Sequence, residues 1–162
     1  MVPERFRIHE TEHWLINHRM DSTLPGYLVL GAKGSEKELT ELPREALTSI
    51  GPLLAASQQA LVKVLRPKRV YFGRFGHMPG FPFHFHIIPI FNWIERLYLK
   101  GAEYYLPNRT AEERAQEEPD GADLTLFVSR AFCESRNPPA IEGPSVARVI
   151  AELRKELQKA AL

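Results

Sequence analysis

Apolar and polar positions alternate near the start of the chain, which is the pattern of a half-buried strand. Residues 12–19 alternate about Trp14 and Ile16. A stretch dense in turn-forming residues, 21–26, then leads into the short apolar run 27–30. We therefore predict two strands, one within residues 12–19 and one at residues 27–30.

The spacing of apolar residues becomes helical between residues 43 and 65. The apolar positions of this segment are Leu47, Ile50, Leu54, Leu61 and Leu65. Pro43 suits a first helical turn, and Pro67 ends the segment. Gly51 and Pro52 conflict with a continuous helix, because an interior proline costs about 3 kcal/mol. We expect a kink or a restart of the helix at this point.

Two further strands are predicted on either side of a short loop. Residues 69–75 are rich in aromatic and β-branched side chains, and residues 83–90 form the next apolar-rich strand. Since only residues 76–80 join them, we expect these strands to be antiparallel neighbours.

Helical patterns and polar surface dominate the last part of the chain. Asn92 and Glu95 resemble a capping box before a short helix. Residues 100–121 are polar and acidic, as in a surface excursion, and residues 124–132 resume a helical period. A final amphipathic helix follows Ser145, with apolar positions at Val146, Ile150, Leu153 and Leu157. Strands before helices of this kind indicate an α+β fold with an antiparallel sheet.

Composition and charge narrow the classes of function. The 162 residues are enough for one domain with its own core, and 44% hydrophobic with 25% charged residues is ordinary for a globular protein. A formal charge of +1 removes the main argument for binding extended nucleic acid, which normally needs a basic surface. A small anionic ligand stays possible, because a nucleotide pocket needs only a few donors.

The sequence lacks three features that would place the protein outside the cytoplasm or in a membrane. Cys133 is the single cysteine, so no internal disulfide can form. Residues 1–12 are too charged for a signal peptide, and no run approaches the roughly 18 apolar residues of a membrane-spanning helix. We expect a cytoplasmic protein that does not bind membranes.

His84 and His86 are the residues most suggestive of chemistry. On a strand they project from one face, because side chains alternate. The opposite face carries Phe83, Phe85 and Ile87. Two imidazoles repeated on one face are not a typical core, because each has a donor and an acceptor that need partners. Imidazole can serve as nucleophile, acid–base group or metal ligand.

Two alternatives to catalysis remain open at this point. The histidines could simply be half-exposed on an open sheet face. They could also supply two ligands to a metal, although zinc needs at least three protein ligands. His77 is the nearest candidate for a third ligand, and Cys133 is far away in sequence.

The segment Phe83-His84-Phe85-His86-Ile87-Ile88-Pro89 resembles the end of the histidine triad (HIT) motif, His-φ-His-φ-His-φφ, where φ is hydrophobic. The order of elements around it is also similar, with two early strands joined by a turn that ends in Pro25-Gly26. The resemblance covers about residues 10–92. It implies a HIT-like antiparallel sheet of about five strands with flanking helices. Residues 93–162 then form a helical extension of a single domain, 1–162.

HIT proteins are usually homodimers that act on nucleoside phosphate derivatives as hydrolases or nucleotidyl transferases. The resemblance implies that His84 attacks the α-phosphorus and forms a covalent nucleotidyl-histidine, and that His86 stabilises the phosphate or manages a proton. Covalent catalysis of this kind divides one hard displacement into two easier ones. The covalent step requires no metal or cofactor.

The sequence departs from the family's pattern at several positions. Pro82 stands where the first triad histidine falls, and Ile90 follows the terminal proline where relatives often carry arginine. Tyr27 follows Gly26 where many relatives have histidine. We consider that His77 could replace the missing imidazole if its loop folds over the strand.

Three other polar residues are candidates for substrate binding. Asn17 and Arg19 end the first predicted strand, where relatives contact the nucleoside sugar, and Arg74 lies on the strand paired with the histidine strand. The hypothesis is a HIT-type enzyme acting on a nucleotide substrate through His84 and His86. The alternatives are a non-catalytic nucleotide-binding module and, third, a His-x-His metal-binding protein.

Overall fold

The computed structural model describes residues 2–75, 80–101, 110, 112–113 and 118–160. Its strands are β1 (Arg7–Glu10), β2 (Trp14–His18), β3 (Leu28–Ala32), β4 (Arg69–Gly73) and β5 (His84–Ile90). Its α-helices are α1 (Arg44–Leu65), α2 (Asn92–Lys100), α5 (Gly121–Ser129) and α6 (Val146–Gln158). Short helical turns lie at η1 (Glu4–Phe6), η2 (Leu39–Glu41) and η3 (Arg130–Glu134).

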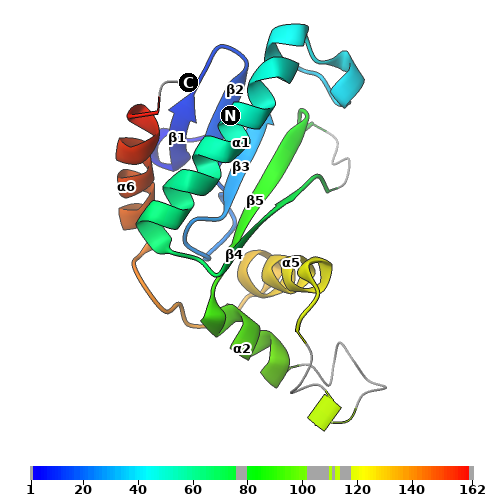
Figure 1. Cartoon of the computed structure of the whole chain (residues 1–162), viewed down its shortest axis with the longest axis vertical. Coiled ribbons are helices and arrows are strands. Elements are labelled where there is room, and N and C mark those ends of the chain that lie inside the picture. The colour runs from blue at the N-terminus through cyan, green and yellow to red at the C-terminus, as the bar shows by residue number, and fades with distance from the viewer. Residues whose placement is uncertain (1, 76–79, 102–109, 111, 114–117, 161–162) are drawn as a thin grey trace.

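The five strands form one antiparallel sheet in the order β1-β2-β3-β5-β4 (Figure 1). The predicted α+β class with an antiparallel sheet of about five strands is therefore confirmed. β4 and β5 are antiparallel neighbours, as their short loop predicts. The edge strand β1 was not predicted, because its four residues are too few to show a period and a bulge interrupts its pairing with β2.

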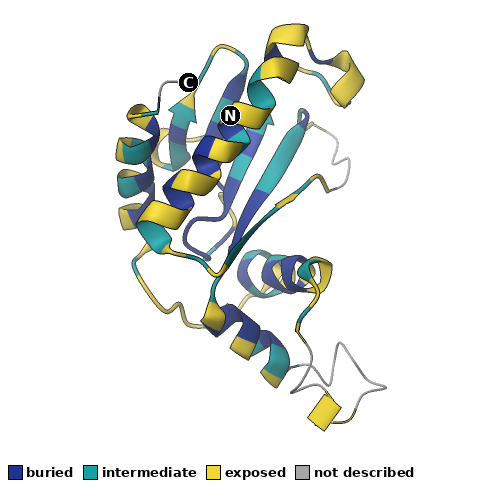
Figure 2. Ribbon diagram, in the orientation of Figure 1, coloured by how far each residue is buried: buried dark blue, intermediate teal, exposed yellow. Residues whose placement is uncertain are grey.

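One core lies between the sheet and the two helices α1 and α6. Trp14, Ile16 and Ile87 come from the strands, and Leu61 and Leu153 come from the helices. Figure 2 shows the buried side of α1 turned toward the strands and its exposed side turned to solvent. Burial of these side chains, at about 25 cal/mol per Å² of apolar surface, is the main force holding this layer together.

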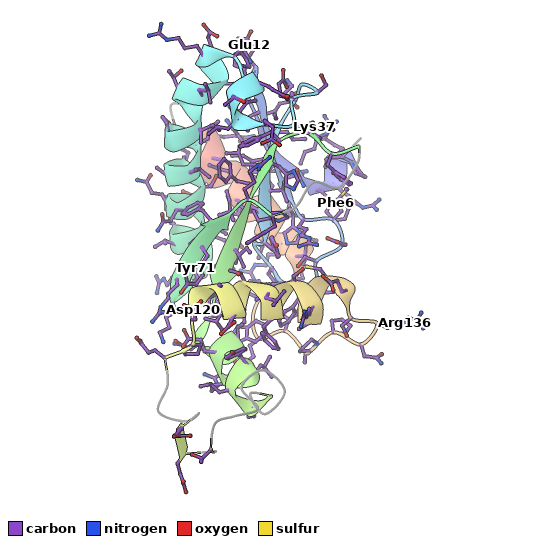
Figure 3. The ribbon with its side chains drawn as sticks, turned by 90° about the vertical axis from the view of Figure 1, so that its right-hand side faces the viewer. Phe6, Glu12, Lys37, Tyr71, Asp120 and Arg136 are labelled. Carbon is purple, nitrogen blue, oxygen red and sulfur yellow. The ribbon has the colours of Figure 1, made fainter. Side chains whose placement is uncertain are left out.

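A second core lies on the other face of the sheet, under α2, α5 and η3. Its buried members are Leu24, Tyr27, Ile88, Ile90, Trp93, Ile94, Tyr98, Leu124, Phe127, Val128 and Phe132. In the side view of Figure 3, α5 crosses the lower end of the strands, with Asp120 at its beginning. These helices cover the end of β5 that carries Ile88 and Ile90, and the preceding part of the strand is only half-buried.

Helix α1 runs through Pro52 as one helix of 22 residues, so the predicted restart is wrong. Pro52 is exposed, and it removes one backbone donor on the solvent side. The buried side of the same helix, which includes Leu53 and Leu61, keeps the helix against the sheet. Tertiary packing therefore outweighs the unfavourable helix propensity of proline here.

Of the two predicted helix caps, the one that begins α6 is confirmed and the one that begins α2 is wrong. The Ser145 side chain accepts a hydrogen bond from the backbone N–H of Arg148 and caps α6, as predicted. The predicted capping box of Asn92 and Glu95 is wrong, because Phe91 is the N-cap of α2 and no side chain caps it. Glu95 instead pairs with Lys68, with 2.6 Å between Oε2 and Nζ.

Gly26, in the turn between β2 and β3, has a φ of +83°. A Cβ atom at this position would lie 2.5 Å from Cδ1 of Leu65 in α1. Both the backbone conformation and the close approach of the helix therefore require glycine here.

No helix in the described part of the chain is long and apolar enough to cross a membrane.

Candidate active site

His84 and His86 project from the same face of β5, as the alternation of the strand predicts. Their ring centroids lie 5.0 Å apart. The pairing of β5 with its neighbours places Val29 and Gly73 beside His86, and Gly31 beside His84. Ile88 and Ile90 lie farther along the same face. The histidines are therefore next to the part of the sheet that α2 and α5 cover.

The backbone fixes the tautomer of His84. Its Nδ1 lies 2.8 Å from the carbonyl oxygen of Pro82. A carbonyl can only accept a hydrogen bond, so Nδ1 carries the proton and donates it. In the neutral ring, Nε2 then has the free lone pair. His84 thus presents an unprotonated nitrogen, the form of imidazole that is nucleophilic.

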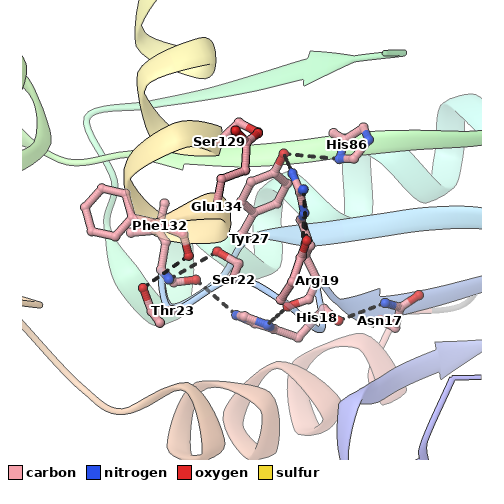
Figure 4. A network of polar contacts seen from close by, with 12 residues as sticks. Asn17, His18, Arg19, Ser22, Thr23, Tyr27, His86, Ser129, Phe132 and Glu134 are labelled. Carbon is pink, nitrogen blue, oxygen red and sulfur yellow. Dashed lines mark hydrogen bonds and ion pairs between the residues drawn. The ribbon is translucent and has the colours of Figure 1, made fainter. Parts of the chain in front are cut away.

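The partner of His86 is the hydroxyl of Tyr27, which lies 3.1 Å from Nδ1 (Figure 4). The same hydroxyl oxygen accepts a hydrogen bond of 2.8 Å from Nη1 of Arg19. Because arginine can only donate, the hydroxyl proton of Tyr27 is free to point at Nδ1 of His86. With the hydroxyl proton in that position, His86 accepts at Nδ1 and carries its proton on Nε2.

Arg19 is itself held by Asp21 through a hydrogen bond of 2.7 Å from Nε to Oδ1. The guanidinium carbon also lies 5.0 Å from the centroid of the Tyr27 ring. Burial opposes the charge of Arg19, but Asp21 and Tyr27 together raise its pKa above the ordinary value. Asp21, Arg19, Tyr27 and His86 thus form a chain of hydrogen bonds that leads from the surface to the histidine pair.

The charge states of this chain agree with its hydrogen bonds. Burial, together with the nearby His84 and Arg19, lowers the pKa of His86 to about 4. Burial raises the pKa of Tyr27 to about 12, although Arg19 acts in the opposite direction. At neutral pH, His86 is therefore uncharged and Tyr27 keeps the proton that it donates.

Two half-exposed aromatic side chains flank the histidines. The ring of Phe75 lies 5.4 Å from that of His86, and the ring of Phe81 lies 6.4 Å from that of His84. Phe75 reaches this place because Gly73 has no side chain. A Cβ at Gly73 would lie 2.3 Å from the Phe75 ring. The site thus combines polar nitrogens with apolar walls, a combination typical of small-molecule sites.

The turn between β2 and β3 is fixed to the C-terminal part of the chain (Figure 4). The carbonyl oxygen of Phe132 in η3 accepts hydrogen bonds from the backbone N–H and from the hydroxyl of Thr23, at 2.9 and 3.2 Å. This turn leads directly into Tyr27. The residues after β5 therefore support the position of a side chain in the site, although they supply neither histidine.

The structure brings some of the predicted substrate-binding residues together and leaves others apart. Arg19 is connected to His86 through Tyr27. Asn17 pairs with Val29, the neighbour of His86, and its Nδ2 donates to the carbonyl oxygen of His18 at 2.8 Å. His77 lies outside the described residues.

Arg74 lies just beyond β4 and is not brought to the histidine pair. Its Nη2 bonds to Oε2 of Glu38 at 3.0 Å, and its guanidinium lies 5.0 Å from the centroid of the Phe83 ring. Phe83 belongs to the core on the other face of the sheet. A role for Arg74 in binding a phosphate stays a prediction.

Sequence reasoning missed Tyr27, Phe75 and Phe81 as parts of the site. Tyr27 could have been found from its place after Gly26, where HIT proteins often carry histidine, since a polar group there suggests a contact with the triad. The two phenylalanines flank the loop before the histidine strand, and nothing in the local pattern distinguishes them from core residues. In the described part of the chain, no three His, Cys, Asp or Glu side chains are grouped to hold a metal ion.

Comparison with solved structures identifies the architecture. A zinc-bound histidine triad family protein from Mycobacterium smegmatis superposes with a TM-score of 0.57 at 16% identity, over 98% of this chain and 86% of that one. A hypothetical histidine triad nucleotide-binding protein from Sulfolobus tokodaii gives 0.52 at 13% identity, over 95% and 86%. The chain has a histidine triad fold. No protein-family model and no curated protein sequence matches it.

The HIT fold is also shared with a larger protein. A uridylyltransferase superposes with a TM-score of 0.55 at 15% identity, over 99% of this chain and 43% of that protein. At such identities the similarity establishes the fold alone. It extends well beyond residues 10–92, the part of the sequence that carries the resemblance to the HIT motif.

Proposed function

We propose that the protein is a nucleotide hydrolase or nucleotidyl transferase that uses His84 as a nucleophile on the α-phosphate. The observation that carries this proposal is the hydrogen bond from Nδ1 of His84 to the Pro82 carbonyl, which leaves the lone pair of Nε2 available. A neutral imidazole can attack phosphorus without prior loss of a proton. The HIT fold and the histidine pair support the same chemistry.

His86 would stabilise the phosphoryl group during this attack. Its Nε2–H is a hydrogen-bond donor beside the nucleophile, because Tyr27 occupies Nδ1. A fixed donor aimed at developing negative charge is typically worth a factor of about 10²–10³ in rate. Asn17 and Arg19 would lie toward the sugar and phosphate of the nucleotide, and His77 is proposed as a further contact from its loop.

Pro82 does not argue against catalysis on this account. The residue lacks the imidazole of the first triad position, but its carbonyl oxygen still accepts the hydrogen bond from His84. The orientation of the nucleophile therefore depends on the backbone. The alternative function, a nucleotide-binding module without chemistry, would keep the same fold and lose turnover.

The test compares turnover of a dinucleoside polyphosphate by the wild type, His84→Ala and His13→Ala. His13 lies between β1 and β2, and its side chain has no part in the site. We expect His84→Ala to reduce kcat/KM by at least about 10³-fold and His13→Ala to leave it unchanged, because only the first removes the nucleophile. Nucleotide binding without turnover by the wild type would instead support the binding module.

We also propose a homodimer, as in most HIT proteins. β4 is an edge of the sheet, and its Phe72 is 39% exposed. An exposed edge strand with an apolar side chain is a common site of pairing with a second chain. Light scattering of the purified protein should give twice the mass of the chain, and Phe72→Lys should shift it toward the monomer.

A further inference from the structure

The chain of hydrogen bonds behind His86 has a consequence for the kind of leaving group that the site accepts. This inference rests on the proposed function. The Tyr27 hydroxyl lies 3.1 Å from Nδ1 of His86. Arg19 donates to the Tyr27 oxygen at 2.8 Å, which leaves the hydroxyl proton to point at Nδ1, and it places a fixed positive charge behind the pair. Both interactions favour the neutral imidazole with its proton on Nε2, and both disfavour a second proton on the ring.

We propose that Arg19 and Tyr27 are positioning residues that keep His86 as a neutral Nε2–H donor, so that the site favours nucleotides whose leaving group departs as an anion. A phosphate or pyrophosphate group is such a leaving group, because its oxygen is stable without a proton at neutral pH. An alkylamine is not, because it must gain a proton before it can depart. The preferred substrates are therefore nucleoside polyphosphates.

The bonds and charges balance without an external acid. In the first step, the lone pair of His84 Nε2 forms the N–P bond. The P–O bond to the leaving phosphate breaks, and its electron pair stays on the departing oxygen. In the second step, a water oxygen forms a new bond to phosphorus, the N–P electron pair returns to Nε2, and the water proton passes to solvent. His86 donates a hydrogen bond in both steps and transfers no proton.

The other groups around His86 support this assignment. Phe75 covers one side of its ring at 5.4 Å, and His84 is its neighbour at 5.0 Å. Asp21 is the one carboxylate in the hydrogen-bonded chain, and it is bonded to Arg19. Its charge is thus offset by the guanidinium that lies between it and Tyr27. Burial of His86 acts in the same direction as Arg19.

The first test reads the tautomer directly, without any substrate. Nitrogen chemical shifts of His86 in the ¹⁵N-labelled protein are recorded for the wild type, Tyr27→Phe, Arg19→Met and Tyr71→Phe. Tyr71 is the matched control, because its hydroxyl bonds to an arginine, Arg69, at 3.3 Å but is not bonded to His86. We expect a single Nε2–H tautomer in the wild type and in Tyr71→Phe, and a mixture of tautomers in Tyr27→Phe. A protonated His86 at pH 6.5 in the wild type, or an unchanged tautomer in Tyr27→Phe, would overturn the assignment.

The second test compares two substrates of the same nucleoside. ADP releases phosphate on attack at the α-phosphorus, and adenosine 5′-(N-propyl)phosphoramidate releases an amine. A general acid typically contributes a factor of about 10²–10⁴, so we expect the wild type to prefer ADP by at least about 100-fold in kcat/KM at pH 7. Arg19→Met, which allows His86 to gain a proton, should reduce this preference by about tenfold at pH 6. Equal rates for the two substrates would overturn the proposal. Failure to turn over either one would contradict the proposed function, and the nitrogen shifts would then decide the role of Arg19 and Tyr27.

Discussion

Nδ1 of His84 lies 2.8 Å from the carbonyl oxygen of Pro82, the residue that stands where the HIT motif has its first histidine. The contact is made by the backbone, so it survives any side chain at position 82. The orientation and the tautomer of His84 are therefore independent of the missing imidazole.

The first prediction follows from this contact. Replacement of Pro82 by alanine or by histidine should change kcat/KM for a dinucleoside polyphosphate by less than about threefold, equivalent to about 0.7 kcal/mol. Steady-state kinetics of the two variants and the wild type provide the measurement. A gain of 100-fold or more in Pro82→His would show that the missing imidazole limits catalysis and that the backbone contact is not enough.

The second prediction concerns stability and pH. His86 has a pKa of about 4 in the folded chain, below the ordinary value of 6.5. Between these pH values the unfolded chain binds a proton that the folded chain does not bind. The free energy of unfolding should therefore fall as pH falls from 6.5 to 4, by up to about 1.4 kcal/mol per pH unit from this residue and less where solvent screens it.

Urea unfolding at pH 7.5, 5.5 and 4.5 measures this slope. His18 and His9 contribute in the same direction, because burial lowers their pKa values as well, so the wild type reports the sum. His86→Gln isolates the contribution of His86 and should make the slope shallower. An identical slope in the wild type and in His86→Gln would contradict the low pKa.

The third prediction concerns Phe75, whose ring covers His86 at 5.4 Å and is half-exposed. Phe75→Ala admits water to the imidazole, so the pKa of His86 should rise from about 4 toward 6.5. Phe72→Ala is the matched control. Phe72 is also exposed, but it pairs with Ile87, whose side chain lies on the opposite face of the sheet. A proton NMR titration of the two variants gives the values, and an equal shift in both would show that Phe75 does not shield His86.

Much of the fold follows from periodicity in the sequence. The alternation around Trp14 and along residues 83–90 predicted β2 and β5, and the helical spacing in residues 43–65 predicted α1. The continuity of α1 through Pro52 was not predictable, because it depends on burial of the opposite side of the helix against the sheet. The edge strand β1 was missed because four residues are too short to show a period.

The candidate site was predictable only where residues are close in sequence. His84 and His86 are two residues apart on one strand, so their common face follows from alternation. Tyr27 is 59 positions from His86, and their contact depends on the pairing of β3 with β5. Arg74 lies near the histidines in sequence, but its guanidinium contacts Phe83, which belongs to the core on the other face of the sheet. The division into a core of residues 10–92 and an extension of 93–162 stays a prediction.

The most direct test of the central claim is a search for the covalent intermediate. The wild type, His84→Ala and His13→Ala are mixed with a dinucleoside polyphosphate and quenched within the first turnover. Mass spectrometry of the proteolytic peptides then locates any nucleotidyl group. The account predicts a nucleotidyl adduct on His84 in the wild type and in His13→Ala, and none in His84→Ala. Turnover by the wild type with the adduct on another residue, or with no adduct at any time point, would contradict it.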